Sequence, residues 1–223
     1  MGETDPRWRL ATKVALVAFS APAVLLLFWR YPPVLLPAVL ALAPVAAIVL
    51  SLRSKGVVSL SGVADPSRVS AFLLGVLPAM LAFRAAQDLN PVSLPLIIAV
   101  GLGGGLVLTG LFWLADHRTT EDLGLLAFLI FCLSCSAGGL ILDLNVRADT
   151  ATPTTYRAVV TERWMPMKRS GHRLRLTAWG PMPAGQAANV TKDVYWAVKV
   201  GDTVCPQLRP GALGLAWYDI KPC

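Results

Sequence analysis

Apolar residues are arranged in two different ways along the chain. Up to residue 145 they form five long runs, whereas beyond residue 150 short apolar segments alternate with polar ones. A helix needs roughly 20 mainly apolar residues to cross a bilayer. The first pattern therefore predicts five transmembrane helices, at residues 14–30, 34–52, 69–86, 93–115 and 123–143.

The second pattern predicts a β domain. Five short segments after residue 154 are rich in β-branched and aromatic residues and are separated by Gly/Pro turns. They are TYRAVVTERW, RLRLTAWG, DVYWAVKVGD, TVCPQL and LGLAWYD. In RLRLTAW, Leu174 and Leu176 alternate with Arg173 and Arg175, as in a half-buried strand. We therefore expect an α-helical membrane bundle at 1–145, followed by a small all-β, barrel-like domain at 146–223.

Composition supports the membrane assignment. Hydrophobic residues make up 55% of the chain and charged residues 15%, and the mean hydropathy is +0.60. The chain is therefore too apolar, and has too few charged residues, for an ordinary soluble domain. The formal net charge is +7, and the last third contributes most of it, with eleven Lys/Arg against five Asp/Glu from residue 146 onward.

Basic residues predict the orientation, because short cytoplasmic loops retain Lys and Arg. With the N-terminus inside, the inner segments hold seven such residues and the outer loops hold two. The inner ones are Arg7, Arg9, Lys13, Arg53, Lys55, Arg68 and Arg118, and the outer ones are Arg30 and Arg84. Five spans then place the β domain outside the cytoplasm. The Ala/Leu/Gly/Pro-rich composition favours a bacterial inner (plasma) membrane, with a periplasmic or extracellular C-terminal domain.

Two cysteines of the β domain can form a disulfide in an oxidising compartment. Cys205 and Cys223 would tie the terminal tail to the last hairpin, and a loop of this length contributes roughly 3 kcal/mol in the chain-entropy model. Two free thiols, or pairing with another protein, are the alternatives.

The stretch VGDTVCPQLRPGALGLAWY resembles the ending of small extracytoplasmic β domains in bacterial multi-pass membrane protein families of uncharacterised function. The resemblance is confined to the C-terminal third. It implies a β-barrel-like module and carries over no catalytic residue.

Cys132 and Cys135 form a C-x-x-C within the last predicted span. Together with Cys205 and Cys223, this pair resembles the two cysteine pairs of membrane thiol oxidases, which implies quinone as a cofactor. However, Cys132 lies near the middle of the span, where a thiolate is disfavoured. The alternative interpretation is helix packing through small residues on two neighbouring spans. These residues are Gly101 and Gly105 in one span and Cys135, Ser136 and Gly139 in the other.

Other chemistry has little support in the sequence. The two histidines, His117 and His172, are predicted to lie on opposite sides of the membrane, which argues against a metal site or a nucleophilic enzyme. Arg84, Asp88 and Asp143 fall at predicted span ends, so the spans contain no evident ion path. We expect no metal, no resident cofactor and no catalytic residue.

Basic and aromatic residues suggest a contact surface on the β domain. Lys168, Arg169, Arg173 and Arg175 are flanked by Trp164 and Trp179. Such a surface suits anionic lipid headgroups or an acidic partner protein. The predicted compartment argues against nucleic acid.

We therefore expect a non-enzymatic accessory, assembly or immunity-type membrane protein whose β domain recognises another membrane or envelope component. The alternatives are a thiol-disulfide oxidoreductase that uses Cys132/Cys135 and Cys205/Cys223, and a transporter or channel subunit.

Overall fold

The computed structural model describes residues 6–28, 35–53, 76–115, 123–165 and 171–223. The chain divides into two units: one comprises Met1–Arg84 and Ile98–Leu140, and the other comprises Ala85–Ile97 and Ile141–Cys223. The second unit, here called the β unit, contains the predicted domain of residues 146–223. It also contains residues 85–97, which connect two helices, and residues 141–147 at the end of a third helix.

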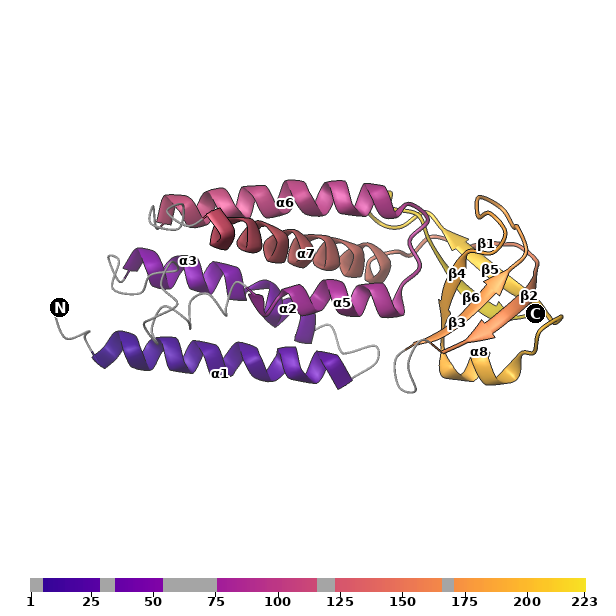
Figure 1. The fold of residues 1–223 in the computed structure, drawn as a ribbon, viewed down its shortest axis with the longest axis horizontal. Coiled ribbons are helices and arrows are strands. Elements are labelled where there is room, and N and C mark those ends of the chain that lie inside the picture. The colour runs from indigo at the N-terminus through magenta and orange to yellow at the C-terminus, as the bar shows by residue number, and fades with distance from the viewer. Residues whose placement is uncertain (1–5, 29–34, 54–75, 116–122, 166–170) are drawn as a thin grey trace. The chain divides into compact units, whose positions relative to one another are not determined.

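The N-terminal two thirds of the chain are helical (Figure 1). The helices are α1 (Pro6–Phe28), α2 (Leu35–Ala41), α3 (Ala43–Arg53), α5 (Ala79–Asp88), α6 (Leu94–Ala115) and α7 (Leu123–Arg147). Only Leu42 separates α2 from α3, because Pro44 lacks an N–H and its ring crowds the carbonyl of Leu40. The helical pattern resumes where Ala46 N donates to Leu42 O at 2.9 Å.

Three apolar helices in the described part of the chain are long enough to cross a membrane. They are Leu35–Arg53, Leu94–Leu114 and Leu123–Arg147, which coincide with the second, fourth and fifth predicted spans. In the first predicted span, 14–30, the apolar helical stretch Leu10–Leu25 is shorter, and residues 29 and 30 lie outside the described ranges. Residues 69–75 of the third predicted span also lie outside them. The total of five spans therefore stays a prediction.

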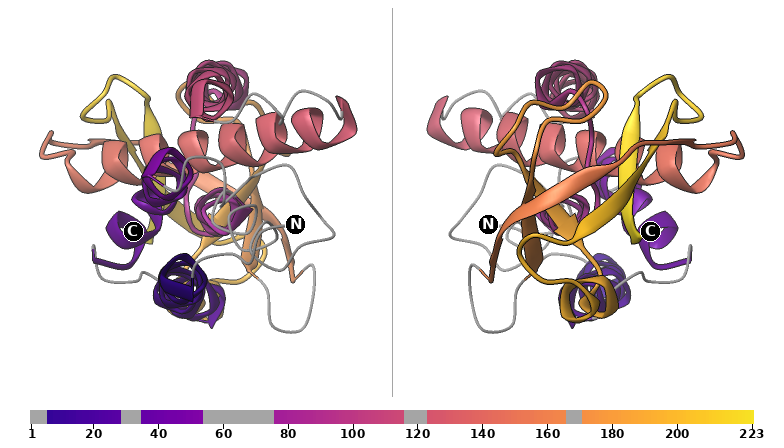
Figure 2. Two further views of the ribbon diagram at one scale, coloured as in Figure 1. Left: turned by 90° about the vertical axis from the view of Figure 1, so that its left-hand side faces the viewer. Right: turned by 90° about the vertical axis from the view of Figure 1, so that its right-hand side faces the viewer.

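The C-terminal part of the chain forms a curled antiparallel sheet (Figure 2). Its strands are β1 (Thr154–Thr155), β2 (Ala158–Trp164), β3 (His172–Leu176), β4 (Ala187–Val190), β5 (Thr203–Arg209) and β6 (Trp217–Pro222). The strand order is β1-β5-β2-β3-β4, and β6 pairs with β5.

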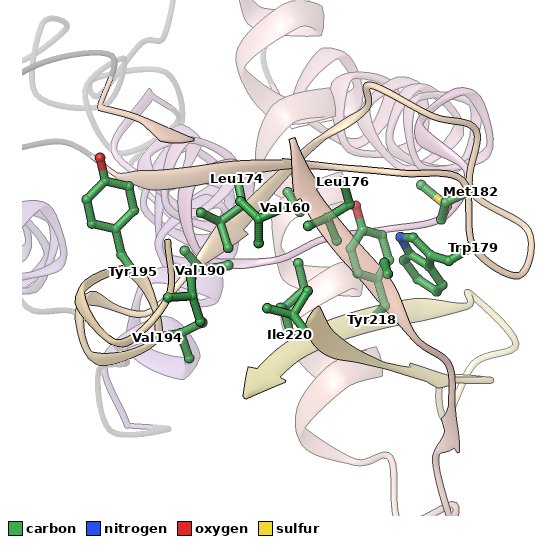
Figure 3. Close-up of a cluster of buried hydrophobic side chains, with 14 residues drawn as sticks. Val160, Leu174, Leu176, Trp179, Met182, Val190, Val194, Tyr195, Tyr218 and Ile220 are labelled. Carbon is green, nitrogen blue, oxygen red and sulfur yellow. The ribbon is translucent and has the colours of Figure 1, made fainter. Parts of the chain in front are cut away.

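The inner face of the sheet encloses an apolar core (Figure 3). Leu174 and Leu176 are buried, as the alternation in β3 predicts. Trp179 packs edge-on against Tyr218, with ring centroids 4.9 Å apart. Burial raises the pKa of Tyr218 to about 12. The hydroxyl therefore stays protonated, which suits a core position.

One predicted strand is wrong. The segment DVYWAVKVGD contains a short helix, α8 (Lys192–Ala197), because Thr191 caps it by accepting a hydrogen bond from Val194 N. Neighbouring Val194 and Tyr195 are both buried, which a strand with alternating faces does not allow. The sequence did not predict β4, because its residues follow a run of turn residues.

Candidate functional site

Arg173 and Arg175 lie on the outer face of β3, beside Trp164 of β2. The Arg175 guanidinium donates to Glu162 Oε2 at 2.6 Å and lies 4.9 Å from the centroid of the Trp164 ring. Both members of this ion pair are half exposed, so the bond contributes at most about 1 kcal/mol to stability. Arg175 therefore already has an anionic partner within the chain.

Arg173 belongs to a structural network. Its Nε donates to Asn189 Oδ1 at 3.2 Å. Asn189 Nδ2 in turn donates to the carbonyls of Ala86 and Leu89, at 3.1 and 3.2 Å, where α5 ends. By bonding Oδ1, Arg173 holds the Asn189 amide in the orientation in which Nδ2 reaches these carbonyls. Arg173 thus helps to join β4 to the end of α5.

The structure describes only part of the predicted basic surface. Lys168 and Arg169 lie outside the described residues. Trp179, which the sequence suggested as a flanking aromatic, is buried in the core. The predicted four-residue cluster therefore stays a prediction.

A different basic and aromatic cluster, which the sequence did not predict, is formed by Arg163, Tyr195 and Trp196. The register of β2 shifts between Val160 and Glu162, and this shift pairs Arg163 with Leu174, a core residue. The Arg163 guanidinium lies 4.4 Å from the Tyr195 ring centroid and 6.0 Å from that of Trp196.

This cluster is open to a partner on one side. Trp196 is 61% exposed although it is the largest side chain of α8. Within the described residues, Arg163 forms no ion pair, and its buried Nε makes no hydrogen bond. A bulge in a strand leaves no clear pattern in a single sequence, so nothing in TERW could have shown where Arg163 points.

The connector between α5 and α6 is part of the sheet. Tyr218 N donates to Asn90 O at 3.0 Å and Val92 N donates to Ala216 O at 2.9 Å, so the connector pairs with β6 like an added strand. The buried side chain of Asn90 meanwhile hydrogen-bonds the backbone of Asn189 in β4. Asn90 therefore links β6 to β4.

The end of α7 is bonded to the turn between β5 and β6. Asn145, which is fully buried, donates from Nδ2 to Leu215 O at 2.8 Å, and its Oδ1 accepts from Leu213 N at 2.9 Å. Asp149 Oδ2 accepts from Gly211 N at 3.0 Å and from Trp217 Nε1 at 2.8 Å.

Hydrogen bonds also determine the titration of Asp149. The Ala151 N–H, the Trp217 indole and the Gly211 N–H stabilise the carboxylate, and nearby Arg209 adds to the effect. Together they hold the pKa of Asp149 below its ordinary value of 3.8. The carboxylate is therefore the form that holds this junction together.

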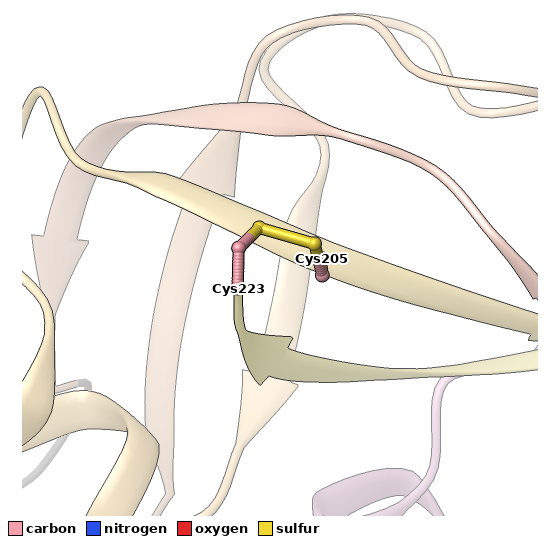
Figure 4. Close-up of a disulfide and its surroundings, with 2 residues drawn as sticks. All are labelled: Cys205 and Cys223. Carbon is pink, nitrogen blue, oxygen red and sulfur yellow. A yellow bond between two sulfur atoms is a disulfide. The ribbon is translucent and has the colours of Figure 1, made fainter.

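The predicted disulfide is present (Figure 4). Cys205 lies in β5 and Cys223 directly follows β6, with 5.1 Å between their Cα atoms. Cys205 pairs in register with Lys221, and Cys223 lies two residues further on the same face, which brings the two sulfurs together. Cys132 and Cys135 are free, and Cys132 is buried.

The predicted packing glycines of α6 face α7. A Cβ on Gly101 would lie 2.8 Å from the carbonyl oxygen of Ser134, and one on Gly105 would lie 2.6 Å from the Ser134 Cα. Ser136 is buried and donates to Cys132 O at 2.7 Å, and Cys135 is partly buried. A Cβ on Gly139 would meet the backbone of Leu81 at 2.6 Å, so this glycine lies against α5.

No family model, no curated protein and no solved structure is significantly similar to this chain.

Proposed function

We propose that the protein is a non-enzymatic multi-pass membrane protein of the accessory, assembly or immunity type, and that its β unit binds an acidic segment of another membrane or envelope protein. The helices serve as the anchor, and the curled sheet presents the recognition surface. The N-terminus lies in the cytoplasm and the β unit lies outside it, in a bacterial plasma membrane. The excess of basic residues in the predicted inner segments and the Cys205–Cys223 disulfide support this orientation.

The observation that carries the proposal is the cluster of Arg163, Tyr195 and Trp196. Interface residues with the largest energetic effect are enriched in Trp, Tyr and Arg. Here one of each lies together, the tryptophan is 61% exposed, and the arginine has no carboxylate partner in the described residues. The basic excess of the last third of the chain attracts an acidic partner to this surface.

Comparative co-purification from host membranes tests the proposal. Trp196→Ala should weaken capture of the partner by about 30-fold or more, because truncating a central interface residue costs at least ~2 kcal/mol. Gln186→Ala is the control, since Gln186 is exposed in the turn before β4 and is not part of the cluster. Equal capture by both variants would count against the proposed surface.

Arg163→Gln separates charge from shape at the same surface. If the partner is acidic, this variant should lose affinity mainly at low ionic strength, where charge attraction is strongest. A loss of capture that does not depend on salt would contradict the acidic character of the partner.

A further inference from the structure

The turn between β5 and β6, residues 210–216, is bonded to helix ends on two sides. Asn145, in the last turn of the candidate span Leu123–Arg147, bonds Leu213 and Leu215. At the other end of the turn, Ala216 O accepts from Val92 N, two residues before the candidate span Leu94–Leu114 begins. The turn therefore lies where one apolar helix ends and another starts.

Four of the six backbone N–H groups of the turn, those of residues 211–214, have partners inside the chain. Gly211 N donates to Asp149 Oδ2 and Leu213 N to Asn145 Oδ1, at 3.0 and 2.9 Å. Ala212 N donates to Asn145 O and Gly214 N to Gly211 O, at 3.2 and 3.1 Å. An irregular segment needs such pairing wherever water is scarce, because an unpaired N–H in an apolar medium costs several kcal/mol.

Side chains change from apolar at the tip of the turn to charged and aromatic at its base, as the surroundings change from acyl chains to headgroups in a bilayer. The tip carries Leu213, which is 58% exposed, and Leu144 on the adjoining turn of α7 is also exposed. The turn itself, PGALGLA, has no charged residue. Arg209 and Trp217 form the last strand pair before the turn, with the guanidinium 5.7 Å from the indole centroid, and these residue types are common at headgroup depth.

An ion pair lies near the end of α7, beside the residues that bond the turn. Arg147 Nε donates to Asp143 Oδ2 at 2.7 Å, and both side chains are partly exposed. An ionised pair at the end of a spanning helix is favoured at the polar edge of the bilayer, because a charge among acyl chains is costly. Asn145, whose Oδ1 accepts from Leu213 N, lies between Asp143 and Arg147 in the sequence. Asn145 and its neighbour Leu144 therefore lie at this edge as well.

We propose that the β5–β6 turn dips into the bilayer that holds α7, with Leu213 in contact with lipid acyl chains and Arg209 and Trp217 at the headgroups. This inference rests on the proposed insertion of α7 into a membrane. The partner is the lipid itself, and Asn145 sets the depth of the turn by fixing the backbone of Leu213.

Spin labels on the full-length protein in phosphatidylcholine/phosphatidylglycerol vesicles test the depth. Leu213→Cys is labelled in a Cys132→Ser/Cys135→Ser background that keeps the Cys205–Cys223 disulfide. Collisions of the label with oxygen, which concentrates among acyl chains, are compared with collisions with a water-soluble nickel chelate. Leu144→Cys is the reference for lipid contact. Val200→Cys is the aqueous reference, because Val200 is 60% exposed and precedes β5 at the end opposite to the turn.

The expected result is a ratio of oxygen to nickel collisions at position 213 that is close to that at 144 and clearly above that at 200. Ala212→Cys, also exposed, should give the same answer as a second reporter. If position 144 contacts lipid but 212 and 213 behave like 200, the turn lies in water, and this inference alone is overturned. If position 144 is itself in water, α7 does not span at this level, and the proposed membrane function falls as well.

Discussion

Asn90 and Asn189 hold each other through two hydrogen bonds, although 99 residues separate them in the sequence. Asn90 Oδ1 accepts from Asn189 N at 2.7 Å, and Asn90 Nδ2 donates to Asn189 O at 2.9 Å. The side-chain amide thus satisfies the same two backbone groups that a neighbouring strand would satisfy. Since the backbone of Asn90 also pairs with Tyr218, one residue of the α5–α6 connector joins β4 to β6.

Replacing Asn90 should destabilise the β unit more than the loss of one ordinary hydrogen bond. Asn90→Ala leaves the buried backbone groups of Asn189 without their partner, which costs about 2–3 kcal/mol. We expect a lower melting temperature for the full-length protein in detergent and faster amide exchange in Ala187–Val190. Gln186→Ala, in the exposed turn before β4, is the control and should change stability by less than about 0.5 kcal/mol. Equal effects of both variants would contradict this role of Asn90.

Gly211 and Gly214 provide a matched pair within one turn. Both have positive φ, +78° and +74°, so alanine at either position pays about 1 kcal/mol for the left-handed backbone. Only at Gly211 would the added Cβ also collide with the Asn145 side chain and Leu215 O, whereas no atom lies within 4 Å of a Cβ on Gly214.

Gly211→Ala should therefore unfold at a clearly lower denaturant concentration than Gly214→Ala. Tryptophan fluorescence reports the transition, and Trp217 contributes to the change because its indole is bonded to Asp149 beside this turn. Similar midpoints would mean that the turn shifts away from Asn145 without cost.

The sequence predicted the elements whose residues alternate in a regular way, but not the contacts between them. β3 follows from the alternation of leucine and arginine, and the long apolar runs predict α6 and α7. In contrast, α8 depends on the cap at Thr191, and the position of Arg163 depends on a register shift. Neither Asn90 nor Asn145 stands out in the sequence, because each becomes buried only when segments 70 or more residues away fold against it.

The disulfide should stabilise the β unit by an amount set by the logarithm of the length of the loop that it closes. Cys205 and Cys223 are separated by 18 positions, for which the chain-entropy model gives about 3 kcal/mol. Reduction of the full-length protein, or Cys205→Ser with Cys223→Ser, should lower the denaturation midpoint to the same value. A reductant should then have no further effect on the double variant. If the double variant unfolds at the wild-type midpoint, the disulfide does not contribute to stability.

The inner cysteines should tolerate serine. Ser136 donates to the carbonyl of Cys132, one helical turn earlier, and a serine at 132 or 135 can satisfy its hydroxyl in the same way. Cys132→Ser with Cys135→Ser should therefore change expression and melting temperature little, by less than about 1 kcal/mol. Thiol labelling after denaturation should find both wild-type cysteines reduced. Partial oxidation, or a mixed disulfide with Cys205 or Cys223, would favour the oxidoreductase alternative.

Asp149 should make the β unit sensitive to acid. Its folded-state pKa lies below 3.8, mainly because the Ala151 N–H bonds the carboxylate. The contribution of the charged form to stability is therefore complete above 3.8 and is lost as the pH falls through the folded-state pKa.

Melting temperatures of wild type and Asp149→Asn, measured from about pH 7 down to about pH 3, check this direction. The wild type should be the more stable protein by a constant margin down to about pH 5, and the margin should shrink below about pH 4 as its carboxylate is protonated. Trp217→Phe removes one donor to the same carboxylate, so it should make this pH dependence smaller without abolishing it. A margin that stays constant to the lowest pH would show that the charge on Asp149 does not hold the junction of Gly211, Trp217 and the end of α7.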